Sequence, residues 1–223
     1  VNLAAALAER GQRVLLVDLD PQGNATMGAG IEKRTALPTV YQILLNQVSV
    51  RDARMRSEPG QFDVIPANRE LAGAEIDLVN LEQRDLRLKV ALAQVADDYD
   101  FILMDCPPTL NLLTVNAFAA AESVLIPMQC EYYALEGLTD LVATIKKVKQ
   151  RLNPAIQIEG LLRVMFDPRS TLAQQVSDQI KQHFGDKVFD TVIPRNVRLA
   201  EAPSYGLPGV VFDPSARGSV AFV

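Results

Sequence analysis

The 223-residue sequence is poor in the residues that most often build metal and redox sites. It has one histidine and two cysteines, Cys106 and Cys130, which lie far apart and fit no metal-ligand spacing. Both cysteines stand among apolar residues, which favours two small buried thiols over a reactive pair. The lone histidine, His183, lies in an amphipathic segment, so we expect it to pack or to face solvent and to take no part in catalysis.

The sequence also lacks long apolar runs, repeats and low-complexity stretches. No apolar run approaches the roughly 18 residues of a membrane-spanning helix, and no secretory signal pattern is visible. We therefore expect a cytoplasmic protein that needs no membrane. Hydrophobic residues make up 48% of the chain, which is ample for a core. Without a linker-like segment, residues 1–223 are predicted to form a single domain.

Acidic residues outnumber basic residues, and the excess is not spread evenly along the chain. The formal net charge is −5, which argues against a generally basic nucleic-acid binder. Residues 131–223 carry 11 Lys and Arg against 10 Asp and Glu, whereas residues 1–130 carry 11 against 17. The acidic excess thus lies in the first part, and a local basic patch remains open in the second.

The stretch VLLVDLDPQGN, residues 14–24, stands at the centre of the sequence pattern. Its apolar start is typical of a strand buried on both faces, as in a parallel sheet. Asp18 and Asp20 are two residues apart and point the same way from an extended chain. Pro21 and Gly23 then favour a turn. Since ligands of open α/β sheets bind at the carboxyl ends of strands, the two acids mark either a functional site or a solvated strand end.

The remaining pattern alternates strands with helices. Further strands are predicted at 62–66, 101–105, 124–127, within 156–166, at 188–193 and at 210–212, and residues 25–31 are expected to form a loop. Helices are predicted at 1–10, 39–45, within 69–97, and at 110–121, 134–152 and 171–184. This alternation predicts an α/β fold, doubly wound, with a mostly parallel sheet covered by helices on both faces.

Several blocks together resemble one family. RVLLVDLDPQGNAT, FILMDCPPTLNLLTVNA, VLIPMQCEYYALEGL, MFDPRSTLAQQV and IPRNVRLAEAPSYG are similar, in this order, to successive blocks of the ParA-type (Soj) partition ATPases. These are deviant Walker A P-loop proteins related to MinD, and the resemblance covers essentially the whole chain. It implies a P-loop NTPase-like fold and an ATP hydrolase that uses ATP and Mg²⁺.

The resemblance also implies roles for particular residues. Asp20 matches the acid that positions or activates the attacking water, and both Asp20 and Asp105 match groups that hold Mg²⁺ through water. Asp18 matches the other acid of the motif, which implies that it belongs to the cofactor site and supports Mg²⁺ from behind the groups that bind the ion directly. A purely structural role for Asp18, as a strand-end hydrogen-bond acceptor, stays equally open. The remaining nucleotide-binding positions implied by the family are Asn24, Pro107, Pro194 and Asn196. For Asn196, an adenine contact through its amide and a plain turn role both stay open.

The resemblance also implies DNA binding, through two arginines. Arg169 and Arg198 match positions where the family binds DNA without reading its sequence, and arginine suits phosphate through its planar fork. A cluster of basic side chains lies at the end of a predicted helix and comprises Lys146, Lys147, Lys149 and Arg151. Their favourable interaction with the helix dipole is enough to explain why they lie there. By resemblance the protein would form an ATP-dependent homodimer, associate with the nucleoid, and be stimulated by a ParB-type centromere-binding partner during chromosome or plasmid segregation.

One departure from the family pattern is the missing phosphate loop. No Gly-Lys-Ser or Gly-Lys-Thr triplet occurs in the sequence, and the chain starts at a segment like the helix that follows this loop. We therefore expect a family member cut at both ends, without its first strand and phosphate loop, that binds ATP very weakly as it stands. Two alternatives stay open: a MinD-like division-site ATPase, and a DNA- or partner-binding module without catalysis.

Overall fold

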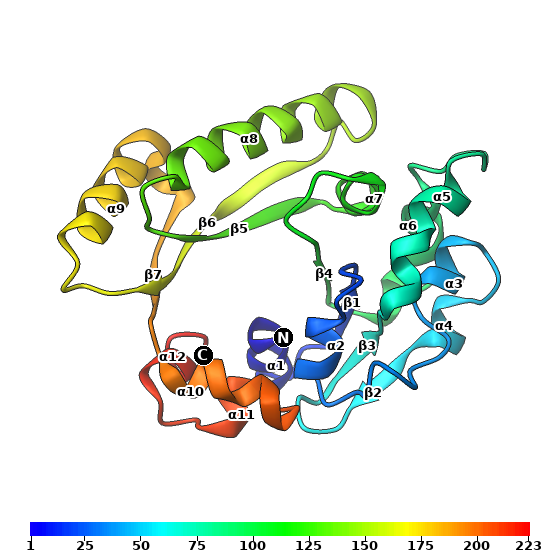
Figure 1. The fold of residues 1–223 in the computed structure, drawn as a ribbon, viewed down its shortest axis with the longest axis horizontal. Helices are drawn as coiled ribbons and strands as arrows, with labels where there is room; N and C mark the ends of the chain where they lie inside the picture. Colours follow the sequence, from blue (N-terminus) through cyan, green and yellow to red (C-terminus); the bar gives the residue numbers. More distant parts are fainter. The chain divides into compact units, whose positions relative to one another are not determined.

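The computed structural model describes all residues from 1 to 223 and divides them into two compact units. The first unit comprises Val1–Ala120 together with Arg198–Val223, and the second comprises Ala121–Val197. We describe each unit by itself. The expected α/β class is confirmed, since each unit pairs parallel strands with helices (Figure 1).

The sheet of the first unit has four strands in the order β2-β3-β1-β4. They are β1 (Val14–Asp18), β2 (Met55–Ser57), β3 (Phe62–Ile65) and β4 (Phe101–Asp105). The central strand β1 pairs in parallel with both β3 and β4, and β2 is antiparallel to β3. Strand β2 was not predicted, because three residues with two polar side chains show no usable alternation.

The helical elements of the first unit are mostly short. Before β4 they are α1 (Asn2–Glu9), α2 (Asn24–Gly28), α3 (Val40–Leu44), α4 (Val50–Ala53), η1 (Arg69–Gly73), α5 (Ala74–Leu78), α6 (Arg87–Leu92) and η2 (Ala96–Asp98). After it come α7 (Leu112–Ala120), α10 (Val197–Glu201), which begins at the last residue of the second unit, η4 (Ala202–Tyr205), α11 (Gly209–Phe212) and α12 (Arg217–Val220).

Apolar side chains bury both faces of this sheet, as the uninterrupted apolar run in β1 predicts. On one face, Leu15 and Val17 pack with residues from α3, α6 and α7. On the other face, Val14 and Leu16 pack with alanines of α1 and α2 and with Val210 of α11. All five residues of β1 are buried, so the strand stands at the centre of the first unit. Its carboxyl end is therefore held from both sides.

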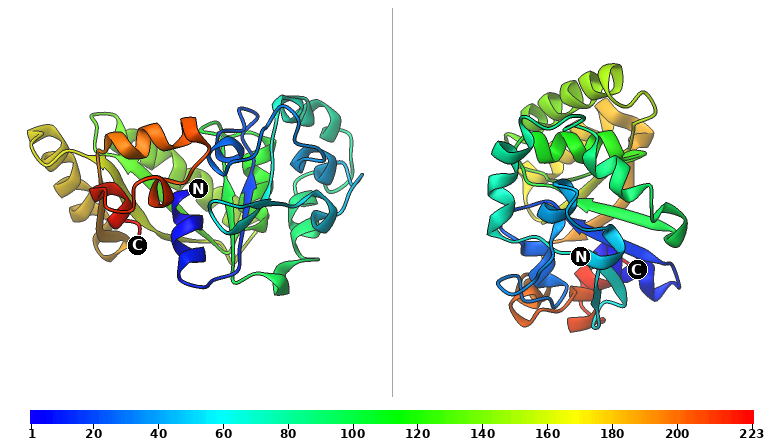
Figure 2. Two further views of the ribbon diagram at one scale, coloured as in Figure 1. Left: turned by 90° about the horizontal axis from the view of Figure 1, so that it is seen from below. Right: turned by 90° about the vertical axis from the view of Figure 1, so that its right-hand side faces the viewer.

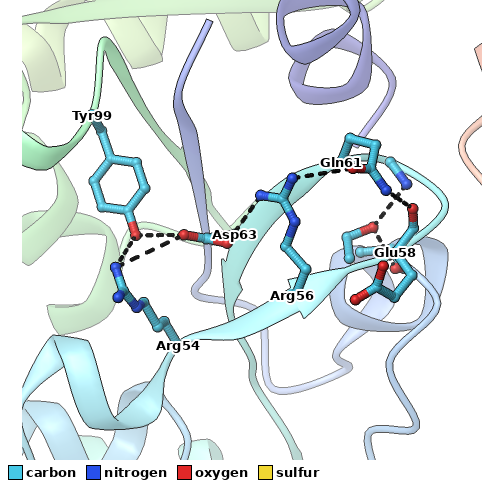
Figure 3. A network of polar contacts seen from close by, with 9 residues as sticks. Arg54, Arg56, Glu58, Gln61, Asp63 and Tyr99 are labelled. Atoms are coloured by element: carbon cyan, nitrogen blue, oxygen red, sulfur yellow. Dashed lines mark hydrogen bonds and ion pairs between the residues drawn. The ribbon is translucent and has the colours of Figure 1, made fainter.

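A polar network closes one side of the β2–β3 hairpin (Figure 3). The Tyr99 hydroxyl, just before β4, donates to Asp63 Oδ2 at 2.8 Å and accepts from Arg54 Nη1 at 3.2 Å. Arg56 donates to Asp63 Oδ1 at 3.2 Å and to Gln61 at 3.3 Å. These bonds join β3 to the segment before β4, and Arg56 places a charged side chain on the edge strand β2.

The C-terminal segment returns to the first helix, and Figures 1 and 2 show α1 beside the chain's last helices. The N–H of Gly209 donates to Asn2 Oδ1 at 2.6 Å, and Arg10 contacts the carbonyl of Val223. The predicted strand at 210–212 is wrong, because these residues form α11. A short apolar run is ambiguous between strand and helix, and here Pro208 sets the helix start by accepting from Val211 and Phe212.

The sheet of the second unit has three parallel strands in the order β5-β6-β7. They are β5 (Ser123–Gln129), β6 (Gln157–Phe166) and β7 (Val188–Pro194), with α8 (Ala134–Arg151), α9 (Thr171–Phe184) and η3 (Gly185–Lys187). Figure 1 shows α8 and α9 running along one face of this sheet. Both helices match their predicted ranges, because each has clear amphipathic periodicity and α9 begins with a Ser170 cap.

A buried arginine fills an irregularity between β6 and β7. Leu161 pairs with Val188 and Arg163 pairs with Val192, so two residues of β6 span four of β7. Arg163 Nη2 donates to the carbonyls of Phe189 at 2.7 Å and Asp190 at 3.1 Å, and Nη1 donates to Ser177 of α9 at 3.1 Å. The guanidinium thereby satisfies carbonyls in the part of β7 where the ladder is irregular, while its own Nε stays without a partner.

Two further observations bear on function. None of the helices is both long enough and apolar enough to cross a membrane. No group of three or more His, Cys, Asp and Glu side chains is arranged to hold a metal ion. Both cysteines are free, and burial raises the pKa of each thiol, that of Cys106 to about 12, so neither is a ready nucleophile.

Candidate functional site

Two predicted site carboxylates end neighbouring strands of the first unit. Asp18 and Asp105 are register partners across β1 and β4, and the N–H of Leu19 donates to the Asp105 carbonyl at 2.8 Å. The parallel ladder therefore brings both side chains to the same edge of the sheet. Asp20 follows within two residues, so three carboxylates gather where β1 and β4 end, at the kind of edge where open α/β sheets bind ligands.

Asp18 is fully buried, and its carboxylate accepts three hydrogen bonds. Oδ1 accepts from the N–H of Asp20 at 3.1 Å, and Oδ2 accepts from the N–H and hydroxyl of Thr26 at 2.8 and 2.7 Å. Burial raises the pKa of Asp18 to about 6, although the hydrogen bonds from Thr26 and Asp20 oppose that rise. This geometry is that of a strand-end acceptor that organises the following turn.

Asp20 lies at the start of that turn and is only partly buried. Its Oδ1 accepts from the N–H of Gln22 at 2.9 Å, and its carbonyl accepts from the N–H of Gly23 at 2.8 Å. Gly23 has φ 62°, and a Cβ there would stand 2.7 Å from the carbonyl oxygen of Ala67. The turn therefore needs glycine for both its conformation and its close approach. Asp20 keeps its Oδ2 for other partners.

Asp105 presents a solvent-accessible carboxylate at the end of β4. Its pKa is raised, mainly because neighbouring chain excludes part of its hydration, and the negative charge of Asp20 adds to the rise. Mg²⁺ in proteins is usually bound by only one or two carboxylates and keeps several of its water ligands. Asp105 and Asp20 fit such an ion if water and phosphate supply its other ligands.

The other predicted residues are divided between the units. Asn24 is the exposed first residue of α2, and the half-buried Pro107 follows β4 by two residues, both in the first unit. Pro194 ends β7, and Asn196 follows in the loop before α10, both in the second unit. The three carboxylates at the ends of β1 and β4 and the predicted adenine-edge loop therefore belong to different units.

Both predicted DNA-binding arginines are exposed and paired. Arg169, in the second unit, donates from Nε at 3.0 Å and from Nη2 at 2.9 Å to Asp167 and has 88% of its side chain exposed. Arg198, in the first unit, bonds Glu201 at 3.1 Å and lies 3.4 Å from Asp213. Each would have to exchange a carboxylate for a phosphate in order to bind DNA.

Sequence reasoning missed Thr26, which supplies two of the three hydrogen bonds to Asp18. The predicted loop at 25–31 is wrong at its start, because residues 24–28 form α2. The helix begins there because Gly23 turns the chain and the Asp18 carboxylate accepts from a first-turn N–H. A threonine eight residues after a strand-end acid gives no recognisable spacing, so its role becomes visible only in the fold.

An open depression of about 490 Å³ lies entirely within the second unit, next to the end of β5. Two of its exposed members, Tyr132 and Tyr133, form an edge-to-face pair with ring centroids 5.0 Å apart. The two tyrosines therefore do not pack in the core of the second unit. The residues lining the depression are Gln129, Glu131, Tyr132, Tyr133, Ala134 and Leu172.

Comparisons with known proteins identify close relatives. A family model described as an AAA domain matches residues 1–158. The chain is 53% identical to the sporulation initiation inhibitor protein Soj of Bacillus subtilis, over the whole chain and 88% of that protein. It is 48% identical to the chromosome partitioning protein ParA of Myxococcus xanthus and 47% identical to the chromosome-partitioning ATPase Soj of Treponema pallidum, covering 79% and 87% of those proteins.

Solved structures show the same fold. Cobyrinic acid a,c-diamide synthase from Mycobacterium smegmatis, with a bound ATP analog and magnesium, superposes with a TM-score of 0.85 at 35% identity, covering 99% of this chain and 83% of that one. The cell division ATPase MinD of Pyrococcus furiosus has a TM-score of 0.79 at 24% identity over 99% of this chain and 86% of that one, and shares the fold alone. With half of its residues identical to those of Soj across its full length, the chain belongs to the ParA/Soj family of chromosome-partitioning ATPases.

Proposed function

We propose that this protein is a partitioning ATPase that binds ATP with Mg²⁺, hydrolyses it, and cycles between DNA-bound and free states. The observation that carries the proposal is the convergence of Asp18, Asp20 and Asp105 at the ends of β1 and β4. Relatives named as chromosome partitioning proteins and a neighbour crystallised with an ATP analog and magnesium support it.

Each carboxylate has a distinct part in this proposal. Mg²⁺, when bound, neutralises charge on the transferring phosphate. Asp105 holds the water shell of that ion from the end of β4, where its carboxylate is accessible. Asp20 orients the attacking water with the oxygen that its turn leaves open. Asp18, buried and fully hydrogen-bonded, fixes the turn. Phosphoryl transfer needs mainly such positioning and charge stabilisation.

The finer cycle is also a proposal. The ATP-bound protein forms a homodimer, the dimer binds DNA through Arg169 and Arg198 without reading sequence, and a ParB-type partner stimulates hydrolysis and release. The predicted adenine contacts from Pro194 and Asn196, and the loop contribution of Asn24 and Pro107, belong to the same proposal. No Gly-Lys-Ser/Thr triplet occurs in residues 1–223, so the proposal assigns no phosphate-binding lysine among them.

The first test is Asp20→Ala in the protein that includes its phosphate-binding loop. We expect steady-state ATP hydrolysis to be abolished, while ATP-dependent dimerisation, measured by sedimentation, persists because the phosphate-binding loop and Asp105 still hold the nucleotide and its metal ion. Asp98→Ala removes a partly exposed carboxylate of the same unit, which pairs with Arg51, and serves as control. Near-parental turnover in Asp20→Ala would remove Asp20 from the catalytic role.

The same experiment separates the rival functions. A binding module without catalysis would show no turnover in the parent protein either. A MinD-like protein would turn over ATP but would need an amphipathic membrane-binding helix, so its binding to anionic vesicles would exceed its binding to duplex DNA.

A further inference from the structure

Thr26 joins three segments of the first unit through one buried side chain. Its hydroxyl donates to Asp18 Oδ2 at 2.7 Å and accepts from the N–H of Ala67 at 2.9 Å. Thr26, Asp18 and Ala67 all have 0% of their surface exposed. The hydroxyl therefore links the carboxyl ends of β1 and β3 by hydrogen bonds that bulk water does not reach, where such bonds are strong and costly to lose.

The link continues to Asp20. The other oxygen of Asp18, Oδ1, accepts from the N–H of Asp20 at 3.1 Å. A continuous chain of hydrogen bonds thus runs from Ala67 through Thr26 and Asp18 to the main chain of Asp20. The close approach of Gly23 to the Ala67 carbonyl holds the same turn against the same strand end.

Removal of the Thr26 hydroxyl would break this chain at both of its bonds. A hydroxyl is donor and acceptor at once, and Thr26 uses both capacities. Valine has nearly the same shape but neither capacity, so it would leave the Ala67 N–H buried without an acceptor and Asp18 with one donor fewer. Serine keeps both capacities. The pair of substitutions therefore separates hydrogen bonding from packing.

We propose that Thr26 is a positioning residue for ATP hydrolysis: its hydroxyl fixes Asp18, and through Asp18 it fixes the main chain at Asp20. The proposal rests on the proposed function, which assigns the orientation of the attacking water to Asp20. Small misplacements of a reacting group are expensive, since about 1 Å can cost on the order of 100-fold in rate. Thr26 itself touches neither nucleotide nor water in this account.

The test compares Thr26→Val with Thr26→Ser in the protein that includes its phosphate-binding loop. We expect kcat for ATP hydrolysis to fall about 10- to 100-fold in Thr26→Val, with KM for ATP little changed and with Thr26→Ser near the parent. Thr39→Val is the matched control, because Thr39 is also fully buried and its hydroxyl contacts Gln42 and Tyr41 at the start of α3. It should lower the melting temperature and leave kcat unchanged.

A second measurement is amide hydrogen exchange without nucleotide. We expect the amides of Ala67 and Asp20 to exchange faster in Thr26→Val than in the parent and in Thr26→Ser. The proposal is overturned if Thr26→Val keeps the parental kcat, or if Thr26→Val and Thr39→Val lose kcat in proportion to their loss of stability. A parent protein without ATP turnover contradicts the proposed function and with it the role in hydrolysis. Parental exchange rates at Ala67 and Asp20 in Thr26→Val contradict the hydrogen-bonded link itself.

Discussion

At the scale of single residues, the first unit uses its acids in different ways. Asp18 is buried and satisfied by neighbours, Asp20 and Asp105 keep accessible oxygens, and Asp100 is held by an arginine. From the sequence, Asp18 and Asp20 look alike, because both end the same apolar strand. Only the helix that follows the turn distinguishes them, since it supplies Thr26 as a donor to Asp18 alone.

The pair of Arg13 and Asp100 gives a prediction about pH. Hydrogen bonds from the Arg13 side chain and N–H lower the pKa of Asp100 from its usual 3.8 to about 2. Because the folded-state pKa lies below that of the unfolded chain, the pair's contribution to stability is present above about pH 4 and is lost as the pH falls toward 2. In Arg13→Gln we expect the Asp100 pKa, measured by NMR titration of its carboxyl, to rise toward the usual value.

The rise should be partial, because the Arg13 N–H still donates to Asp100 in the variant. Arg56→Gln breaks a different pair and should leave the Asp100 titration unchanged. An unshifted Asp100 midpoint in Arg13→Gln would show that the arginine side chain does not hold this carboxylate.

Arg169 and Arg198 carry the prediction about DNA. We expect Arg169→Ala and Arg198→Ala each to weaken binding to arbitrary duplexes by a similar factor for every sequence, since phosphates carry no sequence information. The slope of log affinity against log salt should drop by about one unit for each phosphate that the variant no longer binds. Fluorescence anisotropy across a salt series measures both quantities.

Arg51→Ala is the control for the DNA experiment. Arg51 is also exposed and paired with an acid, Asp98, but lies outside the motifs that resemble DNA-binding blocks. If the Arg169 and Arg198 variants bind with parental affinity and salt slope, the DNA-binding patch lies elsewhere.

At the scale of elements, the helices and strands that could be predicted are those whose sequences show a clear hydrophobic pattern. Strands β1 and β4 and helices α8 and α9 were predicted because long apolar or amphipathic runs have one interpretation. The short elements α2 and α11 were not, because their conformation depends on a glycine turn, a proline and tertiary partners. The candidate site reflects this division: its strand-end acids were predicted, and its threonine was not.

The irregular pairing of β6 and β7 gives a prediction about stability. Arg163→Met would leave the carbonyls of Phe189 and Asp190 without their donor in a partly buried site. We expect the free energy of unfolding to fall by about 1–3 kcal/mol, measured by chemical denaturation of the whole chain. Arg151→Met, at the exposed end of α8, should change stability little. Parental stability in Arg163→Met would mean that the bulge does not depend on the guanidinium.

At the scale of the whole molecule, the chain forms two compact units. The metal-side and water-side carboxylates belong to the first unit, and the proposed adenine loop belongs to the second. The family and the α/β class could be predicted from ordered sequence blocks, because such blocks extend along the entire chain. The division into units could not, since no linker or composition change marks residues 120–121 or 197–198.

The most direct test of the proposed site is to measure by calorimetry how ATP binding depends on Mg²⁺, in the protein that includes its phosphate-binding loop. We predict that Asp105→Asn weakens ATP binding about 10- to 100-fold in Mg²⁺ and leaves binding in EDTA unchanged, since Asp105 acts only on the metal. Asp100→Asn, before the opposite end of β4, should bind like the parent in both conditions. Parental magnesium dependence in Asp105→Asn would contradict the claim that the strand-end carboxylates form the metal side of a nucleotide site.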